Sequence, residues 1–105
     1  TATPDIDLIY SHADDMAIGC ARAIEAAGSK AILVATGGGS KLGYNAILSG
    51  EMYGSVCTRP KLLGALMFEA MYEAVTKPET PKGRFVSYDM PAITKETIES
   101  CPEQW

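Results

Sequence analysis

The chain has 105 residues, of which 47% are hydrophobic, and thirteen acidic residues against nine basic ones give it a formal net charge of −4. This length allows one domain at most, and the apolar content is that of a folded protein and not of a disordered segment. An acidic balance without any cluster of lysine and arginine argues against a nucleic-acid-binding protein. No apolar run approaches the roughly 18 residues that a membrane-spanning helix needs.

The first half of the chain alternates short apolar runs with helix-like stretches. Residues 7–12 and 32–35 are apolar runs typical of buried strands, and residues 52–57 predict a third strand. Between the first two strands, apolar residues recur with a helical period, with Asp14 as the expected N-cap and Gly28 as the stop. A short helix is expected over residues 40–48, capped by Ser40.

The second half is predicted to contain one long helix and a return strand. Pro60 suits a first helical turn, and the helix is expected over residues 61–76. Its apolar stripe, which we expect to be core, consists of Leu63, Leu66, Met67, Ala70, Met71 and Ala74. After a loop over residues 77–83, the alternation in residues 84–89 predicts a strand with one wet face. Residues 94–97 are expected to open a last short helix.

This order of elements predicts an α/β fold, with a parallel sheet covered by helices on both faces. Right-handed crossovers place the carboxyl ends of all its parallel strands at one edge, where such sheets bind ligands. Residues 11–14, 36–40 and 57–60 are expected to meet at that edge. The middle segment carries the run Thr36-Gly37-Gly38-Gly39-Ser40, whose glycines either let the backbone approach a ligand or make a tight turn.

Neither a metal site nor a catalytic site is expected. The three cysteines, Cys20, Cys57 and Cys101, are widely spaced and the chain has one histidine, so we expect free thiols and no zinc. Asp14 and Asp15 diverge at a helix start, and no activated nucleophile accompanies His12. The glycine run fits neither a phosphate loop nor a dinucleotide fingerprint. The sequence therefore predicts a protein that is not an enzyme and has no cofactor.

Three blocks of sequence resemble the C-terminal part of periplasmic sugar-binding proteins of the ribose and galactose type. Residues 4–28 read PDIDLIYSHADDMAIGCARAIEAAG, residues 45–52 read NAILSGEM, and residues 55–64 read SVCTRPKLLG. The resemblance runs from residue 4 to about residue 95. It implies the type I periplasmic-binding-protein fold, in which two α/β lobes joined by a hinge clamp the ligand. Residues 1–105 would be part of the C-terminal lobe, without the N-terminal lobe, and the open sheet edge makes self-association of the chain possible.

The resemblance also implies where the ligand contacts fall. The family's Asn, Asp and Gln anchors align with Ala13, with Gly37 or Gly38, and with Thr58. Arg59 offers five donors next to the rigid Pro60. The expected ligand-binding residues are His12, Ala13, Asp14, Thr36, Gly37, Gly38, Thr58 and Arg59. Asp14 is expected to cap the helix more than to touch the ligand directly.

The function implied by the resemblance is binding of a sugar or sugar-like solute in the periplasm for uptake by an ABC transporter, whose permease would be the partner. Two alternatives share the fold. The GGGS run is similar to one in receptors for furanosyl autoinducer-type signals, where an arginine near the third strand, one place from Arg59, serves the ligand. The other alternative is the effector-binding core of a lactose-repressor-type regulator.

Overall fold

The protein folds into a mixed α/β structure, and its computed structural model describes residues 5–77 and 79–101. Its sheet has four strands in the order β1-β2-β3-β4. The elements in chain order are β1 (Leu8–Ser11), α1 (Asp14–Ala26), β2 (Ile32–Ala35), α2 (Lys41–Ser49), β3 (Gly54–Val56), α3 (Pro60–Thr76), β4 (Ala92–Thr94) and a 3₁₀ turn, η1 (Ile98–Ser100). The predicted α/β class is therefore confirmed.

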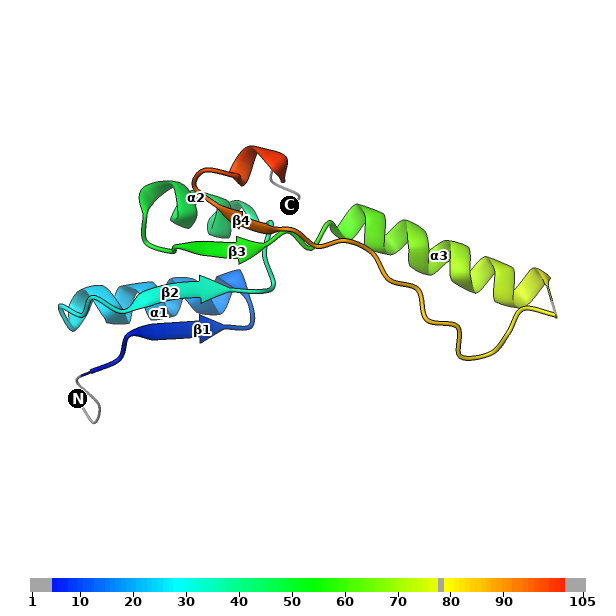
Figure 1. Cartoon of the computed structure of the whole chain (residues 1–105), viewed down its shortest axis with the longest axis horizontal. Coiled ribbons are helices and arrows are strands. Elements are labelled where there is room, and N and C mark those ends of the chain that lie inside the picture. The colour runs from blue at the N-terminus through cyan, green and yellow to red at the C-terminus, as the bar shows by residue number, and fades with distance from the viewer. Residues whose placement is uncertain (1–4, 78, 102–105) are drawn as a thin grey trace.

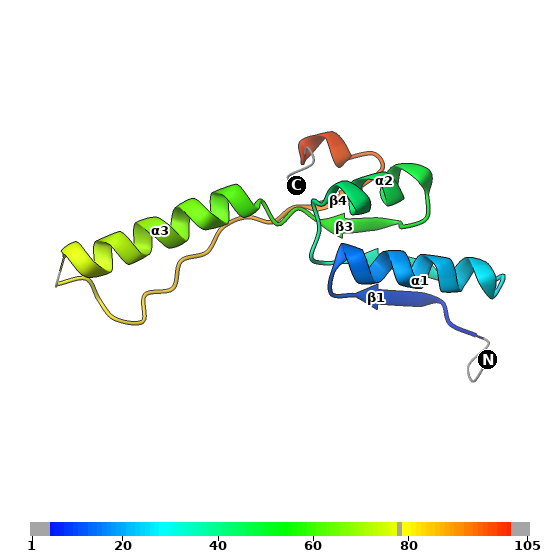
Figure 2. The same cartoon turned by 180° about the vertical axis from the view of Figure 1, so that it is seen from behind.

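Three of the strands are parallel and the fourth returns antiparallel. Strand β1 pairs in parallel with β2 from Leu8 with Ile32 to Ser11 with Ala35, and β2 pairs in parallel with β3. Strand β4 runs antiparallel to β3. The strands β1, β2 and β3 lie side by side in the same order as in the chain. Right-handed crossovers between them therefore place α1 and α2 on the same face of the sheet. Both views of the molecule show them there (Figures 1 and 2).

The core lies between these two helices and the sheet. Small residues of α1, such as Ala17 and Ala21, allow this helix to lie close to the strands. Larger buried side chains complete the layer, namely Leu33, Ile47, Met52, Ile93 and Ile98. On the opposite face, Leu8, Tyr10 and Ile32 are each about half exposed. No helix of the described residues covers that face, so the expectation that helices cover both faces of the sheet is wrong for the described part of the chain.

Helix α3 projects away from the sheet as an arm (Figure 1), and none of its residues is buried. Met67 and Met71 of the predicted apolar stripe are 57% and 65% exposed, so the expectation that this stripe is core is wrong for the described residues. The stripe exists, but the described part of the chain offers no surface that covers it. A contiguous apolar patch of this kind marks an interaction site.

The segment that follows α3 runs back along the arm and is not a strand. Arg84 and Lys77 both donate to the Glu73 carboxylate, at 2.8 and 3.2 Å. The hydrogen bond from Lys77 and then that from Arg84 hold the pKa of Glu73 below its usual value. The predicted strand over residues 84–89 is wrong, because these residues have no neighbouring strand. The return strand is Ala92–Thr94 instead, where the edge of β3 is open for pairing.

The helix ends follow local rules at most positions. Ser40 caps α2 as predicted, accepting a hydrogen bond from the Gly43 amide. Helix α1 ends at Ala26, and Gly28 follows it with a φ of 60°, a left-handed conformation that suits glycine. The predicted N-cap is wrong, because Ala13 occupies that position and Asp14 is the first helical residue. The last helical segment is η1, and it begins after the predicted residues 94–97.

Two of the three cysteines form a disulfide, so the expectation of free thiols is wrong for them. Cys57 at the end of β3 bonds to Cys101 after η1, 44 residues further along the chain, with their Cα atoms 5.9 Å apart. Both residues are buried, whereas Cys20 is a free, half-buried thiol. The bond ties the end of the described chain to the edge of the sheet.

Loss of the disulfide should lower the stability of the sheet body. We expect Cys101→Ser to reduce the free energy of unfolding by about 4 kcal/mol, the chain-entropy value for a loop of this length. Urea denaturation of the variant and of the wild type, with and without reductant, measures the change. Cys20→Ser is the matched control and should leave the curve in place. Superimposable curves for Cys101→Ser and wild type would show that the bond contributes nothing.

The exposed arm should make the chain associate with itself, because its apolar surface lacks a cover. Sedimentation velocity at increasing protein concentration should show a rising sedimentation coefficient for the wild type. We expect Phe68→Glu combined with Met71→Glu to suppress the rise. The exposed Leu42 of α2 provides the control, and Leu42→Glu should leave the association unchanged. A monomer at all concentrations would contradict the expectation.

Candidate functional site

The carboxyl ends of the parallel strands gather three loops at one edge of the sheet. We call this edge the rim and define it as residues 11–14, 36–40 and 57–59. The Asp14 amide donates to the Gly37 carbonyl at 3.3 Å, which joins the first loop to the second. Gly38 pairs with Cys57, and the Thr58 amide donates to the Gly38 carbonyl at 3.3 Å, which joins the second loop to the third. The predicted meeting of the three segments is confirmed.

Two aromatic rings lie where β1 enters the first loop, one from Tyr10 in the strand and one from His12 in the loop. His12 is exposed and packs edge-to-face on Tyr10, with ring centroids 5.2 Å apart. The Tyr10 hydroxyl lies 3.1 Å from the Thr36 hydroxyl, within hydrogen-bond distance. Sequence reasoning selected His12 and Thr36 but missed Tyr10. The period of two in a strand would have placed Tyr10 on the same side as His12.

Asp14 lies beneath the rim and does not open onto it. Its side chain is 2% exposed. One carboxylate oxygen, Oδ2, accepts from the Ser40 amide at 3.3 Å and from the Ser40 hydroxyl at 2.8 Å. The other, Oδ1, accepts from the Ser55 hydroxyl at 2.9 Å. We call Asp14, Ser40 and Ser55 the Asp14 cluster. Ala13, which aligns with the family's Asn, is half-buried on the rim itself.

The glycines of the second loop are needed because the protein itself fills the space around them. A Cβ on Gly37 would lie 2.7 Å from the His12 carbonyl oxygen, and one on Gly38 would lie 2.5 Å from that of Val56. A Cβ on Gly43 would overlap the Asp14 carboxylate. Real Cβ atoms do not approach this closely. The glycines therefore allow the rim loops to pack on one another, which accounts for their positions without a ligand.

The third loop starts the arm with a strained residue. The Thr58 hydroxyl donates to the Gly38 carbonyl at 2.7 Å, and Tyr88 on the returning segment donates to the Thr58 carbonyl at 3.0 Å. Arg59 has a φ of 45°, the only positive value among the described residues other than glycine. Such a conformation costs about 1–3 kcal/mol and is concentrated at functional sites. Arg59 is half-buried where the sheet body meets α3.

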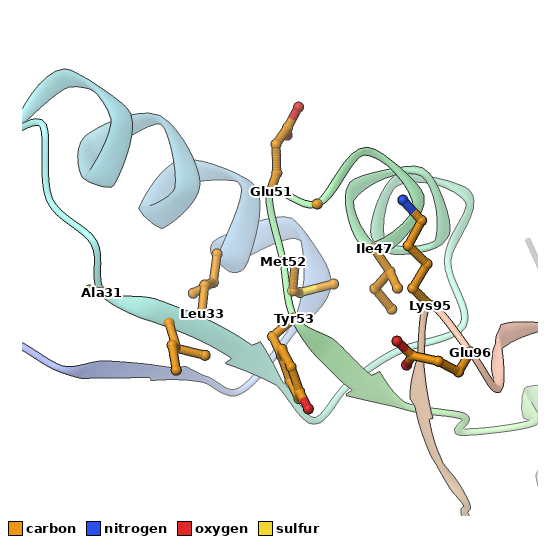
Figure 3. A pocket seen from close by; sticks show the side chains of 10 residues that line it. Ala31, Leu33, Ile47, Glu51, Met52, Tyr53, Lys95 and Glu96 are labelled. Atoms are coloured by element: carbon orange, nitrogen blue, oxygen red, sulfur yellow. The ribbon is translucent and has the colours of Figure 1, made fainter.

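A separate hollow of about 370 Å³ lies at the opposite edge of the sheet. Figure 3 shows it between β2, the end of α2, the start of β3 and the residues after β4. Its floor is apolar, with Leu33, Ile47 and Met52, and Lys95 and Glu96 stand at its border. The pKa of Glu96 is lowered, mainly by the Thr94 hydrogen bond. None of the predicted ligand-binding residues lines this hollow.

In residues 5–77 and 79–101, no group of three His, Cys, Asp or Glu side chains could hold a metal ion. None of the helices in this part of the chain has the length and apolar character needed to cross a membrane.

A parallel sheet that gathers three loops at its carboxyl edge is the arrangement of α/β ligand-binding proteins. Residues 1–79 match the model of the periplasmic binding protein domain. The chain belongs to this family, and the membership predicted from its sequence blocks is confirmed.

Three of the proteins similar to this chain are named for a sugar or were solved with one bound. The ribose import binding protein of Haemophilus influenzae is 32% identical over 95 residues, which are 90% of this chain and 30% of that protein. An ABC transporter periplasmic solute binding protein from Actinobacillus succinogenes, solved with bound D-allose, matches 94% of this chain and 34% of its own, with 29% identity and a TM-score of 0.77. A galactofuranose binding protein matches 92% of this chain and 33% of its own, with 26% identity and a TM-score of 0.74.

These similarities establish the fold and the share of the relatives' length that the chain covers. The predicted type I periplasmic-binding-protein fold is confirmed, and the chain spans about a third of the length of the relatives it matches.

The clash at Gly43 gives a test of the rim packing. Gly43→Ala should destabilise the protein by about 1–3 kcal/mol, because the added methyl group overlaps the Asp14 carboxylate. Gly19→Ala in α1 is the matched control, since open space surrounds that position. It should stabilise by about 0.5–1 kcal/mol through helix propensity. Thermal unfolding of both variants compares them, and equal shifts in one direction would contradict the packing.

Proposed function

We propose that this chain is part of the C-terminal lobe of a protein that binds a sugar or sugar-like solute between two lobes, for uptake by an ABC transporter. The observation that carries the proposal is the rim, where three loops from successive parallel strands form one edge. The sugar-binding relatives support the choice of ligand class. Because the chain spans about a third of their length, the missing lobe would supply the other contacts.

The arm supports the two-lobe arrangement. Helix α3 has an apolar stripe and no buried residue, so it needs a partner surface, and we propose the first lobe. The chain leaves the sheet body through Thr58 and Arg59 and returns through Tyr88. The Tyr88 hydrogen bond to the Thr58 carbonyl holds these two crossings together. We propose that they form part of the hinge on which the lobes close.

We propose that the groups facing the ligand are His12, Thr36 and Arg59, joined by Tyr10. The Tyr10 and His12 rings offer an apolar surface to one side of a sugar ring. The Thr36 hydroxyl and the guanidinium of Arg59 offer donors to its oxygens. Ala13, Gly37, Gly38 and Thr58 border the same space but lack the carboxylate and amide groups of the family anchors. Hydroxyl recognition would therefore depend more on Arg59 and on the missing lobe.

The disulfide supports a location outside the cytoplasm. Structural disulfides form and persist in oxidising compartments such as the periplasm. The Cys57–Cys101 bond is buried, as expected for a structural bond. Together with the family membership, this supports a periplasmic solute-binding protein that works with a membrane permease and performs no turnover.

The alternative readings receive less support. The GGGS run suggested an autoinducer-type receptor, but close packing accounts for Gly37 and Gly38, and a φ of 97° accounts for Gly39. A lactose-repressor-type regulator would carry a DNA-binding helix-turn-helix before the core. The parent gene upstream of Thr1 discriminates, because a signal peptide supports transport or signalling and a helix-turn-helix supports regulation.

Titration with sugars tests the proposal. We expect the 105-residue chain to bind pentoses and hexoses weakly, in the millimolar range or above, because half of the contacts are absent. Amide chemical shifts should change at the rim and not around the hollow at the opposite edge. Arg59→Ala should reduce the changes, and Arg22→Ala on the exposed side of α1 should not. Tight binding by the chain alone, or shifts confined to the hollow, would contradict the two-lobe proposal.

A further inference from the structure

We propose that Asp14 is a positioning residue, whose buried carboxylate joins the first and second loops of the rim to β3, the strand that leads into the third loop, without touching the ligand. The inference rests on the proposed function, because the rim is taken as the ligand-binding edge. It differs from the sequence expectation, in which Asp14 capped its own helix and bordered the ligand.

The carboxylate is shared between elements that are distant in sequence. Asp14 begins α1, Ser40 precedes α2 and Ser55 lies in β3. Oδ2 is held by two donors of Ser40, and Oδ1 by one donor of Ser55. Each oxygen therefore fixes a different neighbouring element against the start of α1. No oxygen faces outward, since the side chain is 2% exposed.

The members of the Asp14 cluster depend on one another for their hydrogen bonds. A buried carboxylate is tolerated only when it is hydrogen-bonded, and the first turn of α1 adds a favourable dipole. The Ser40 hydroxyl also accepts from the Gly43 amide, so the same group caps α2 and binds Asp14. Among the described residues, no buried side-chain nitrogen or oxygen lacks a hydrogen-bond partner. Removing the carboxylate would leave three donors unpaired at once.

The cluster is connected to the surface groups by short links. The Asp14 amide donates to the Gly37 carbonyl, next to Thr36. Ser40 is two residues from Gly38, whose carbonyl accepts from both the amide and the hydroxyl of Thr58. A shift of the cluster would therefore displace Thr36 and Arg59 relative to each other. Their spacing is what a rigid sugar would recognise.

Two substitutions at Asp14 separate positioning from contact. Asp14→Asn can keep its amide oxygen on the Ser40 donors, while its NH₂ group donates to Ser55, whose hydroxyl rotates to accept. Asp14→Ala removes every acceptor. Asp15→Asn, at the adjacent exposed position, is the matched control. Ser55→Ala removes one donor and provides a milder variant if Asp14→Ala does not fold.

Amide hydrogen exchange in the 105-residue chain is the first readout. In Asp14→Ala, or in Ser55→Ala to a smaller extent, we expect exchange at Thr36 and Thr58 to rise about tenfold or more, although neither amide bonds to Asp14. Exchange at Met52 and Tyr53, at the opposite edge, should stay unchanged. A rise at Ser40 alone, or an equal rise everywhere, would overturn the inference.

Sugar binding is the second readout. It is measured by the amide chemical shifts of the rim residues as D-ribose or D-allose is added. We expect Asp14→Ala to weaken binding about tenfold or more and Asp14→Asn to stay within about threefold of the wild type. Equal losses in both variants would show direct contact and overturn the inference, as would unchanged binding in Asp14→Ala. If the wild type shows no rim shifts with any sugar, the proposed function fails, and the exchange rates still decide whether the cluster joins the loops.

Discussion

The hydrogen bonds to the Asp14 carboxylate are the interactions on which the rest of the sheet edge depends. They bring the starts of α1 and α2 and the middle of β3 to one point. Because the carboxylate and the Ser55 hydroxyl occupy that point, Gly43 and Gly38 have no room for a side chain. The glycine run after β2 thus follows from packing, and the loops that it allows to meet carry the outward groups of the rim.

The packing of the chain is complete on one side only. Helices α1 and α2 cover one face of the sheet, whereas Leu8, Tyr10 and Ile32 remain half exposed on the other. The arm likewise has no cover, and a helix of 17 residues owes little of its stability to propensity alone. Both open surfaces agree with a chain that spans about a third of its relatives. The Asp14 cluster supports the rim from the closed side, whereas Tyr10 and Tyr88 connect it to the open face and to the segment that returns from the arm.

The local elements could be predicted from sequence because local rules govern them. The apolar runs located β1 and β2, and Ser40 marked the start of α2. Residues 84–89 have the alternation of a strand, but pairing decides the outcome, and β3 pairs with residues 92–94 instead. The apolar stripe of α3 could be identified from its helical period. The period does not show whether another surface covers the stripe.

The long-range interactions could not be predicted in the same way. The pairing of Cys57 with Cys101 cannot be inferred from the spacing of the cysteines. The position of Asp14 at a helix start indicated a cap, but its partners lie 26 and 41 residues away. Of the rim, sequence therefore indicated which segments meet and which groups they carry. It did not indicate which of these groups face outward.

The disulfide also makes the arm part of a covalent ring. The ring runs from Cys57 through α3 and the returning segment to Cys101. A single cut in the exposed stretch after α3 would open this ring without releasing either piece. After such a cut α3 would remain attached to β3 through Thr58 and Arg59, whereas the piece that carries β4 and η1 would be held covalently by the disulfide alone. Backbone cleavage and reduction would therefore have to coincide for that piece to separate.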